Sequence, residues 1–143
     1  MTNQEAFTIA VQHTRTQGIP SRLSFPELKC LYRHPDGIRK CIVGALIPDR
    51  EYSRHMEDVS LYVVVTMTPS LRSINIYLLM ELQKAHDAMI TTTPWLEWME
   101  IEFIRIARDF ELQVPPHPCS VESTDVSNKC INNDVQQLEN VNA

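Results

Sequence analysis

The chain has 143 residues, of which 43% are hydrophobic and 22% charged, and its formal net charge is −5. This length fits one domain and is short for two, and the charged share is that of an average globular protein. Up to Leu112 there are 12 Lys and Arg against 14 Asp and Glu, so the folded part is nearly neutral, which disfavours bulk binding to a phosphate backbone.

No stretch of the sequence is long enough to cross a membrane. The densest β-branched run, 61–65, falls far short of the roughly 20 apolar residues that a bilayer requires. The N-terminus has no apolar signal core, and four cysteines in such a chain are expected to be reduced thiols. We therefore expect a cytoplasmic protein.

The first predicted element is a helix over residues 3–17. Thr2 and Glu5 have the spacing of a capping box, in which each side chain accepts a hydrogen bond from a free backbone N–H. Gly18 suits a left-handed stop. Apolar and small residues then recur on one face, namely Phe7, Ala10, Val11 and Thr14.

Residues 28–47 predict a β-hairpin around a turn at His34-Pro35-Asp36-Gly37. Proline presets one turn dihedral and glycine accepts the positive φ that follows. A two-residue loop places Cys30 opposite Cys41, whereas a bulged three-residue loop places Cys30 opposite Ile42. The sequence favours the bulged form, with two separate thiols.

The remaining elements follow from periodicity. Residues 57–67 fit either a strand or a buried helix, because a short apolar run cannot decide between them. A broad apolar ridge from Ser70 predicts a central helix. Thr93 and Pro94 predict the N-cap and first residue of a final helix that runs to Leu112. Its inner face is predicted to be Leu96, Met99, Phe103, Ile106, Ala107 and Phe110.

These elements predict an α+β fold: about three helices packed on a β-hairpin, with a third strand if residues 57–67 are extended. Residues 1–112 form the single globular domain. Residues 113–143 are polar, contain no aromatic residue and have no periodicity, so we expect a disordered tail.

Cysteines and histidines near the turn suggest a metal or thiol site. Cys30, His34 and Cys41 supply three ligand types that zinc accepts, with a fourth ligand to come from His55, His117 or Cys119. Their spacing matches no familiar zinc motif, and strand cysteines are commonly small buried apolar residues. We therefore expect no metal and no cofactor.

His86 is the further member of a possible enzyme site. A metal- or thiol-dependent enzyme would use Cys30, Cys41, His34 and His86. No complete catalytic constellation is visible, however, and the pair His86-Asp87 at a helix end is typical of a solvated pair. We expect a non-enzymatic protein.

A basic cluster on the predicted hairpin suggests a binding surface. Arg33, Arg39 and Lys40 surround Tyr32, and a basic ribbon can bind an acidic protein surface or nucleic acid. The alternative is a solvated strand face that carries cations to prevent edge pairing.

A second candidate surface lies on the final helix. With the inner face assigned as above, Trp98, Ile101 and Arg105 point outward among charges. Trp and Arg are frequent at binding hot spots. The alternative is that another element covers them. Homodimerisation through this helix is compatible with either.

The segment 30–49 resembles a group of small proteins from tailed phages and some bacteria. Its pattern is C-x-Y-R-x-x-D-G-x-x-K-C-x-x-G-x-L-I-P-D. Tyr52, Met56-Glu57 and the run 82–87 resemble later motifs of the group, and the similarity covers about residues 3–112. The resemblance implies an accessory protein that binds and inhibits or modulates a host protein complex, as anti-defence and anti-CRISPR proteins do.

Overall fold

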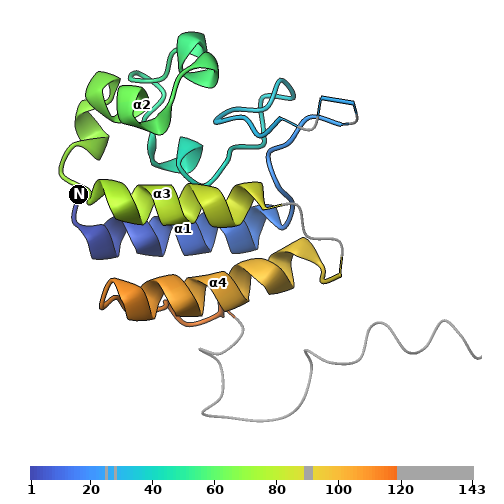
Figure 1. The fold of residues 1–143 in the computed structure, drawn as a ribbon, viewed down its shortest axis with the longest axis vertical. Helices are drawn as coiled ribbons and strands as arrows, with labels where there is room; N and C mark the ends of the chain where they lie inside the picture. Colours follow the sequence, from blue (N-terminus) through green and yellow to red (C-terminus); the bar gives the residue numbers. More distant parts are fainter. Residues whose placement is uncertain (25, 28, 89–91, 119–143) are drawn as a thin grey trace, which may run out of the picture.

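The computed structural model describes residues 1–24, 26–27, 29–88 and 92–118. The described residues form the helices α1 (Asn3–Gln17), α2 (Leu61–Met67), α3 (Ile76–Asp87) and α4 (Trp95–Asp109) and the 3₁₀ turns η1 (Gly44–Leu46), η2 (Arg54–Asp58) and η3 (Pro69–Leu71). Helices α1, α3 and α4 pack together, while α2 and the connecting segments lie on the far side from α4 (Figure 1).

Helix α1 confirms the predicted boundaries. The Thr2 hydroxyl accepts a hydrogen bond from the Glu5 amide at 3.1 Å, and the Glu5 carboxylate accepts one from the Thr2 amide at 2.6 Å. Gly18 ends the helix in the left-handed region with φ of 70°. The capping box therefore starts α1 where the sequence indicates.

Of the three long helices around the shared core, α1 and α3 run parallel and α4 runs antiparallel to both (Figure 1). Helices α1 and α3 begin at the same end, where the Asn75 amide donates to the Asn3 side chain at 2.8 Å. Helix α4 runs the opposite way and contacts both. The rings of Phe7 on α1 and Phe103 on α4 meet edge to face, with centroids 6.0 Å apart, at the centre of the core.

The starts of α3 and α4 lie later than the sequence predicts. The predicted central helix begins at Ser70, but that residue belongs to η3, and α3 begins after Asn75, whose side chain accepts from the Tyr77 amide at 2.9 Å. Pro94 is the N-cap of α4 rather than its first residue, and no side-chain cap bond from Thr93 is present.

The predicted β-hairpin over residues 28–47 is wrong, and the α+β fold class is wrong with it. The part of the chain that the structure describes contains no strand. It contains two isolated β-bridges, one between Arg33 and Lys40 and one between Arg22 and Cys30. The described fold is helical.

The expected turn is nevertheless present. The Gly37 amide donates to the His34 carbonyl at 3.1 Å, and Gly37 has φ of 74°. The strand-like backbone pairing of the two arms does not continue into residues 42 and 43. Ile42 and Val43 are adjacent in the chain, and both are fully buried. Successive residues of a strand point to opposite faces, so this segment has no solvent face. It turns instead into η1, which packs on α1, and neither predicted hairpin register occurs.

The ambiguous segment 57–67 is helical. Glu57 and Asp58 complete η2 and residues 61–67 form α2, so there is no third strand among the described residues. Helix α2 contacts α3 and η3, and Val64 is its one fully buried residue.

The ordered chain continues past Leu112. The Gln113 amide donates to the Gln4 side chain at 2.8 Å, and the Arg15 guanidinium donates to the carbonyls of Pro115 at 2.8 Å and Pro116 at 3.2 Å. The first residues of the predicted tail are therefore held against α1. The rest of that tail, 119–143, lies outside the described residues.

Within the described ranges, no helix combines the length and the apolar character needed to span a bilayer.

Gly44 is expected to be the glycine most sensitive to substitution, because a Cβ there would overlap the backbone carbonyl of Tyr32. We expect Gly44→Ala to lower the free energy of unfolding by about 2 kcal/mol or more. Gly18→Ala serves as the control, since it meets no neighbouring atom and costs only the left-handed strain of about 1 kcal/mol. Urea unfolding measures the free energy of unfolding of both variants. An equal loss in the two would contradict the close approach of Gly44 to the Tyr32 carbonyl.

Candidate functional site

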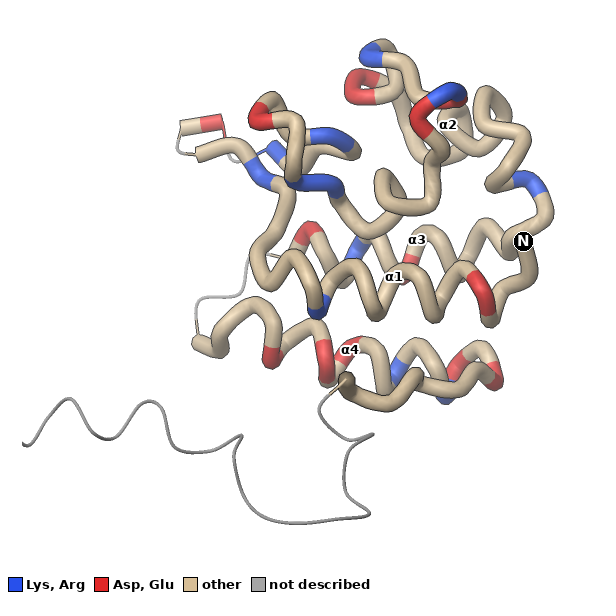
Figure 2. The backbone as a smooth tube through the Cα atoms, turned by 180° about the vertical axis from the view of Figure 1, so that it is seen from behind, with Lys and Arg blue, Asp and Glu red and all other residues tan. Residues whose placement is uncertain are grey.

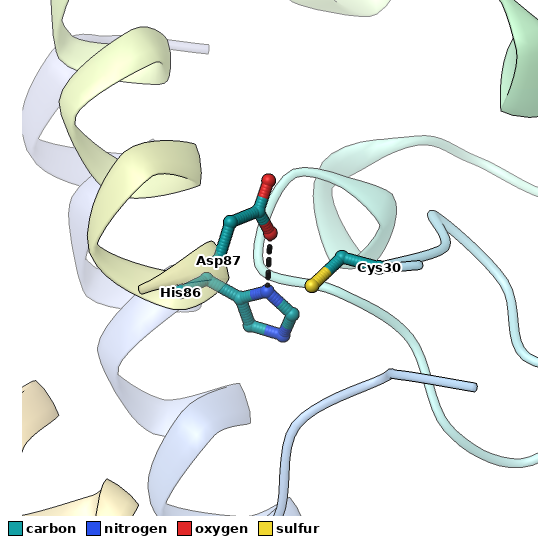
Figure 3. A group of neighbouring side chains, drawn as sticks. All are labelled: Cys30, His86 and Asp87. Atoms are coloured by element: carbon teal, nitrogen blue, oxygen red, sulfur yellow. Dashed lines mark hydrogen bonds and ion pairs between the residues drawn. The ribbon is translucent and has the colours of Figure 1, made fainter. Parts of the chain in front are cut away.

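The structure does not bring the candidate metal ligands Cys30, His34 and Cys41 together and forms a different group. Of the potential ligands in the described residues, Cys30, His86 and Asp87 place one ligand atom each within 4.8 Å of one another (Figure 3). His34 lies with Asp36 instead, its Nδ1 3.0 Å from the carboxylate. Cys41 is fully buried in the core. The candidate trio of Cys30, His34 and Cys41 therefore does not form.

We define the thiol cluster as Cys30, Cys41, Gln83, His86 and Asp87. The Asp87 carboxylate is its central hydrogen-bond acceptor. Its carboxylate lies 2.9 Å from His86 Nδ1 and accepts two hydrogen bonds of 2.8 Å from the Gln83 amide. Burial alone would raise the pKa of Asp87, but the hydrogen bonds from His86, Gln83 and Cys30 outweigh it and lower that pKa. Asp87 is thus an anion at neutral pH.

The hydrogen bonds of His86 fix its tautomer. The backbone N–H of Ser21 donates to Nε2 at 3.3 Å, so that nitrogen carries no proton, and the proton of the neutral ring lies on Nδ1 towards Asp87. A metal ion on Nδ1 would move the proton to Nε2, where it would face the Ser21 N–H. The geometry therefore opposes metal binding by His86.

His86 is also not the solvated residue that the sequence suggested. Its side chain is 1% exposed, and its ring packs edge to face on Trp95 with centroids 5.5 Å apart. Both ring nitrogens are engaged within the protein, so His86 has no free nitrogen with which to act as a general base.

Neither described cysteine has the properties of a nucleophile. Burial raises the pKa of Cys30 to about 11, although the Arg22 guanidinium, 3.4 Å from Sγ, opposes the shift. Burial also raises the pKa of Cys41, whose Sγ accepts from the Gly44 amide at 3.2 Å and donates to Gln83 at 3.5 Å. Both are thiols at neutral pH, and the thiolate is the reactive form.

The thiol cluster closes the C-terminal end of α3. The last carbonyls of a helix lack intrahelical partners. Here Arg22 donates to the carbonyls of His86, Asp87 and Ala88 at 3.3–3.5 Å. The indole of Trp95 also donates to the His86 carbonyl, at 3.4 Å. This arrangement fixes Ser21, Arg22 and Cys30, which follow α1 in the chain, to the C-terminal end of α3. Its role is structural.

A second network holds the first predicted partner-binding residue, Arg33. Its guanidinium lies 2.7 Å from Asp49, donates to the Ile47 carbonyl at 2.9 Å, and stacks over the Tyr52 ring at 4.3 Å. Glu57 accepts from the amides of Tyr32 and Arg33 at 2.9 Å each and from the Tyr52 hydroxyl at 2.9 Å. Tyr32 and Arg33 are thus engaged within the protein.

The other cations of the basic cluster are paired as well. Arg39 lies 2.6 Å from Asp36, Lys40 lies 3.4 Å from Asp49, and Lys29 lies 3.0 Å from Asp58. Figure 2 shows acidic positions interleaved with the basic ones along this part of the chain. Asp49 pairs with both Arg33 and Lys40, so the charge of the basic cluster is largely compensated, which does not favour a phosphate backbone.

The outward face predicted for α4 is partly covered. Trp98 packs against the core, and its indole donates to the Ala85 carbonyl on α3 at 3.2 Å. Arg105 is 33% exposed and forms ion pairs with Glu81 and Glu102 at 2.8 Å and 2.7 Å. Ile101 remains 57% exposed. Of the three predicted residues, only Ile101 offers a free apolar side chain.

The structure shows an exposed apolar surface that the sequence prediction did not include. The α2 face consists of Val59, Tyr62, Val63 and Met67, which are 36%, 54%, 41% and 44% exposed. The signal was present in the sequence, because no Asp, Glu, Lys or Arg occurs from residue 59 to residue 71. From sequence alone, however, an uncharged segment such as 59–71 is expected to be wholly buried.

Thiol chemistry provides a direct check on the cluster. In a variant with Cys119 and Cys130 changed to serine, we expect Cys30 to react with dithionitrobenzoate at pH 8 about 100-fold more slowly than a thiol of pKa 9.0. Because the thiolate fraction sets the rate, the rate should rise about tenfold for each pH unit up to pH 10.

The same variant in concentrated urea is the control, because unfolding exposes both thiols to water. A native rate equal to the unfolded rate would show that Cys30 is an accessible thiolate and would restore the thiol-enzyme hypothesis.

Arg33 should be a stability residue rather than a contact residue. We expect Arg33→Lys to lower the free energy of unfolding by about 2 kcal/mol, because lysine cannot reproduce the fork to Asp49 and Ile47 or the stacking on Tyr52. Arg39→Lys, on an exposed pair with Asp36, should cost less than half of that. Urea unfolding at equal ionic strength measures both losses. An unchanged urea midpoint for Arg33→Lys would contradict a stabilising role for Arg33.

Comparisons of the chain with protein-family models, with curated proteins and with solved structures gave no match.

Proposed function

We propose that the protein is a non-enzymatic binding module that holds a partner protein on the α2 face. The observation that carries this proposal is that most of the apolar surface of α2 is not buried. Val64 is the one fully buried residue of the helix, while Tyr62, Val63 and Met67 face solvent. An exposed apolar patch on a globular domain is typical of an interaction site.

The local chemistry of α2 supports the same conclusion. The helix has only 7 residues and no side-chain cap at Ser60. Its centre, Val63 to Val65, consists of β-branched residues, which are weak helix formers. Helix α2 therefore depends on packing, and packing covers it on one side only. A partner on the open side would stabilise it.

The other two functions that the sequence suggested lack comparable support. A thiol- or metal-dependent enzyme needs a nucleophile or an open ligand, and Cys30 and His86 supply neither. A nucleic-acid interface needs uncompensated cations, and Arg33, Arg39 and Lys40 are paired.

The resemblance to the tailed-phage group suggests the kind of partner. A phage accessory protein that acts without catalysis works by occupying a host protein. We therefore propose a host protein complex as the partner and inhibition or modulation as the outcome.

Lysate capture with paired variants tests the proposal. We expect the tagged protein to retain a stoichiometric protein from bacterial lysate, and Tyr62→Ala/Met67→Ala to lower its affinity at least tenfold. Alanine removes the contact while favouring the helix, so α2 should remain folded, as checked by circular dichroism and urea unfolding.

Ile101→Ala/Ile104→Ala is the matched control, since it removes two exposed side chains from α4, where they are 57% and 65% exposed. If the Ile101→Ala/Ile104→Ala variant fails to capture the protein and the α2 variant still captures it, the binding surface lies on α4. Equal capture by all forms would refute the α2 proposal.

A further inference from the structure

We infer that Gln4, Arg15 and Glu100 form a binding site for an extended, proline-containing segment of a partner protein, and that residues 112–118 of this chain fill that site when no partner is bound. We call the three residues the strap site and residues 112–118 the strap. The strap site lies on α1 and α4, and its assignment does not depend on the function proposed for α2. The contacts of the strap show which chemistry the site accepts.

The strap runs back alongside α4 after the chain turns at the C-terminal end of that helix (Figure 1). Near the start of α1, Gln113 is bound by Gln4. In the last turn of α1, Arg15 binds Pro115 and Pro116. The strap therefore connects the two ends of α1.

The sequence of the strap favours an extended backbone. A residue that precedes proline is restricted to extended conformations, and Val114, Pro115 and His117 each precede a proline. Proline also lacks the N–H that a helix interior needs. Such a segment loses little conformational entropy on binding, which is why proline-rich segments are common ligands of proteins.

Gln4 binds the backbone of the strap and not one of its side chains. Its amide oxygen accepts from the Gln113 N–H at 2.8 Å, and its amide nitrogen donates to the Gln113 carbonyl at 2.9 Å. One side chain thus satisfies both backbone groups of one residue, as a neighbouring strand would. Another extended segment offers the same two groups, whatever its side chain at that position.

Arg15 also binds the backbone of the strap. One guanidinium nitrogen donates to the carbonyls of Pro115 at 2.8 Å and Pro116 at 3.2 Å. The other two nitrogens donate to the two carboxylate oxygens of Glu100 at 2.7 Å and 2.9 Å, and the Arg15 side chain is only 8% exposed. If the strap left, the first nitrogen would need new acceptors, and the carbonyls of another extended segment would supply them.

An aliphatic side chain lies between these two backbone contacts. Val114 is partly buried and packs against the core, as Leu112 does. The strap is therefore held by backbone hydrogen bonds at residues 113, 115 and 116 and by apolar packing at residue 114. A matching partner segment has an aliphatic residue followed directly by two prolines.

The turn that leads into the strap is strained. Glu111 has φ of 55°, and it is the one non-glycine residue with positive φ in the described ranges. It occupies the position where a Schellman motif usually has glycine, because the Leu112 N–H donates to the Ala107 carbonyl at 2.8 Å and the Glu111 N–H to the Arg108 carbonyl at 3.4 Å. A left-handed glutamate costs free energy. Release of the strap removes this strain, and release is the step that opens the site to a partner.

A peptide of residues 112–118 with blocked ends and a fluorescent label tests the strap site. The protein is the full chain with Val114→Asp, because a charge at this partly buried position weakens docking of the chain's own strap and leaves the strap site unchanged. Fluorescence anisotropy should show that the peptide binds this variant roughly tenfold more tightly than it binds the parent, whose own strap competes. Circular dichroism and urea unfolding check that the variant is folded.

Two matched changes test the hydrogen bonds of residue 113. Gln4→Ala in the Val114→Asp chain should weaken binding of the peptide about tenfold, because both bonds are lost. Gln12→Ala, at an exposed position on the same helix, should stay within about twofold. A peptide methylated on the nitrogen of residue 113 lacks the donor for Gln4, and it should also bind about tenfold more weakly without any change in the protein.

The Tyr62→Ala/Met67→Ala variant separates this site from the α2 face. Helix α2 lies on the far side from α4 (Figure 1), so the double substitution in the Val114→Asp chain should leave binding of the peptide within about twofold. The lysate capture and the peptide titration can therefore succeed or fail independently.

Three results would overturn the inference. One is no binding of the peptide to the Val114→Asp chain up to about 1 mM. Another is equal binding of the methylated and unmethylated peptides. The third is a parent chain that is dimeric by light scattering and becomes monomeric with Val114→Asp, which would identify the strap of a second copy as the ligand in place of a partner protein.

Discussion

The carboxylate of Asp87 is the interaction on which the rest of the structure depends. It accepts hydrogen bonds from His86 and Gln83 at the end of α3 and lies beside the Cys30 thiol. His86 in turn holds the Ser21 amide, and Gln83 reaches Cys41. The loops on either side of the 34–37 turn are thereby fixed to α3 without strand pairing. Buried polar groups are costly unless they are satisfied, so this network also specifies one position for those loops.

The residues that carry the phage-group resemblance lie largely in two internal networks. Cys30, Cys41, Gln83, His86 and Asp87 form the thiol cluster, and Arg33, Asp49, Tyr52 and Glu57 form the second network. In both, the polar atoms bond to one another or to the backbone. These motifs explain how a chain with few regular elements between α1 and α3 adopts one structure. The α2 face lies outside both networks.

Local sequence signals predicted what local physics decides. The capping box at Thr2 and the left-handed Gly18 define α1, and the turn at Gly37 forms as its residues require. The hairpin failed because burial against α1 overrode the β propensity of Ile42 and Val43, and pairing depends on such tertiary contacts. For the site, the sequence suggested Cys30 and His86 and assigned Asp87 only to a solvated pair with His86, because the contact of Asp87 with Cys30 depends on the geometry at the end of α3. Trp98 was placed outward because a single helical wheel does not show that α3 covers its flank. The α2 face was missed because an uncharged run is ordinarily buried.

The two networks hold the fold together, whereas α2 is held weakly, by packing on one side only. Native-state hydrogen exchange of the free full-length chain, analysed by mass spectrometry of peptides, tests both halves at once. Amides of α3 are expected to exchange only through global unfolding, whereas amides of α2 are expected to exchange through local opening at a free energy well below the global value. Equal protection of α2 and α3 would contradict it, because α2 would then be an integral part of the core and its exposed side chains an ordinary surface.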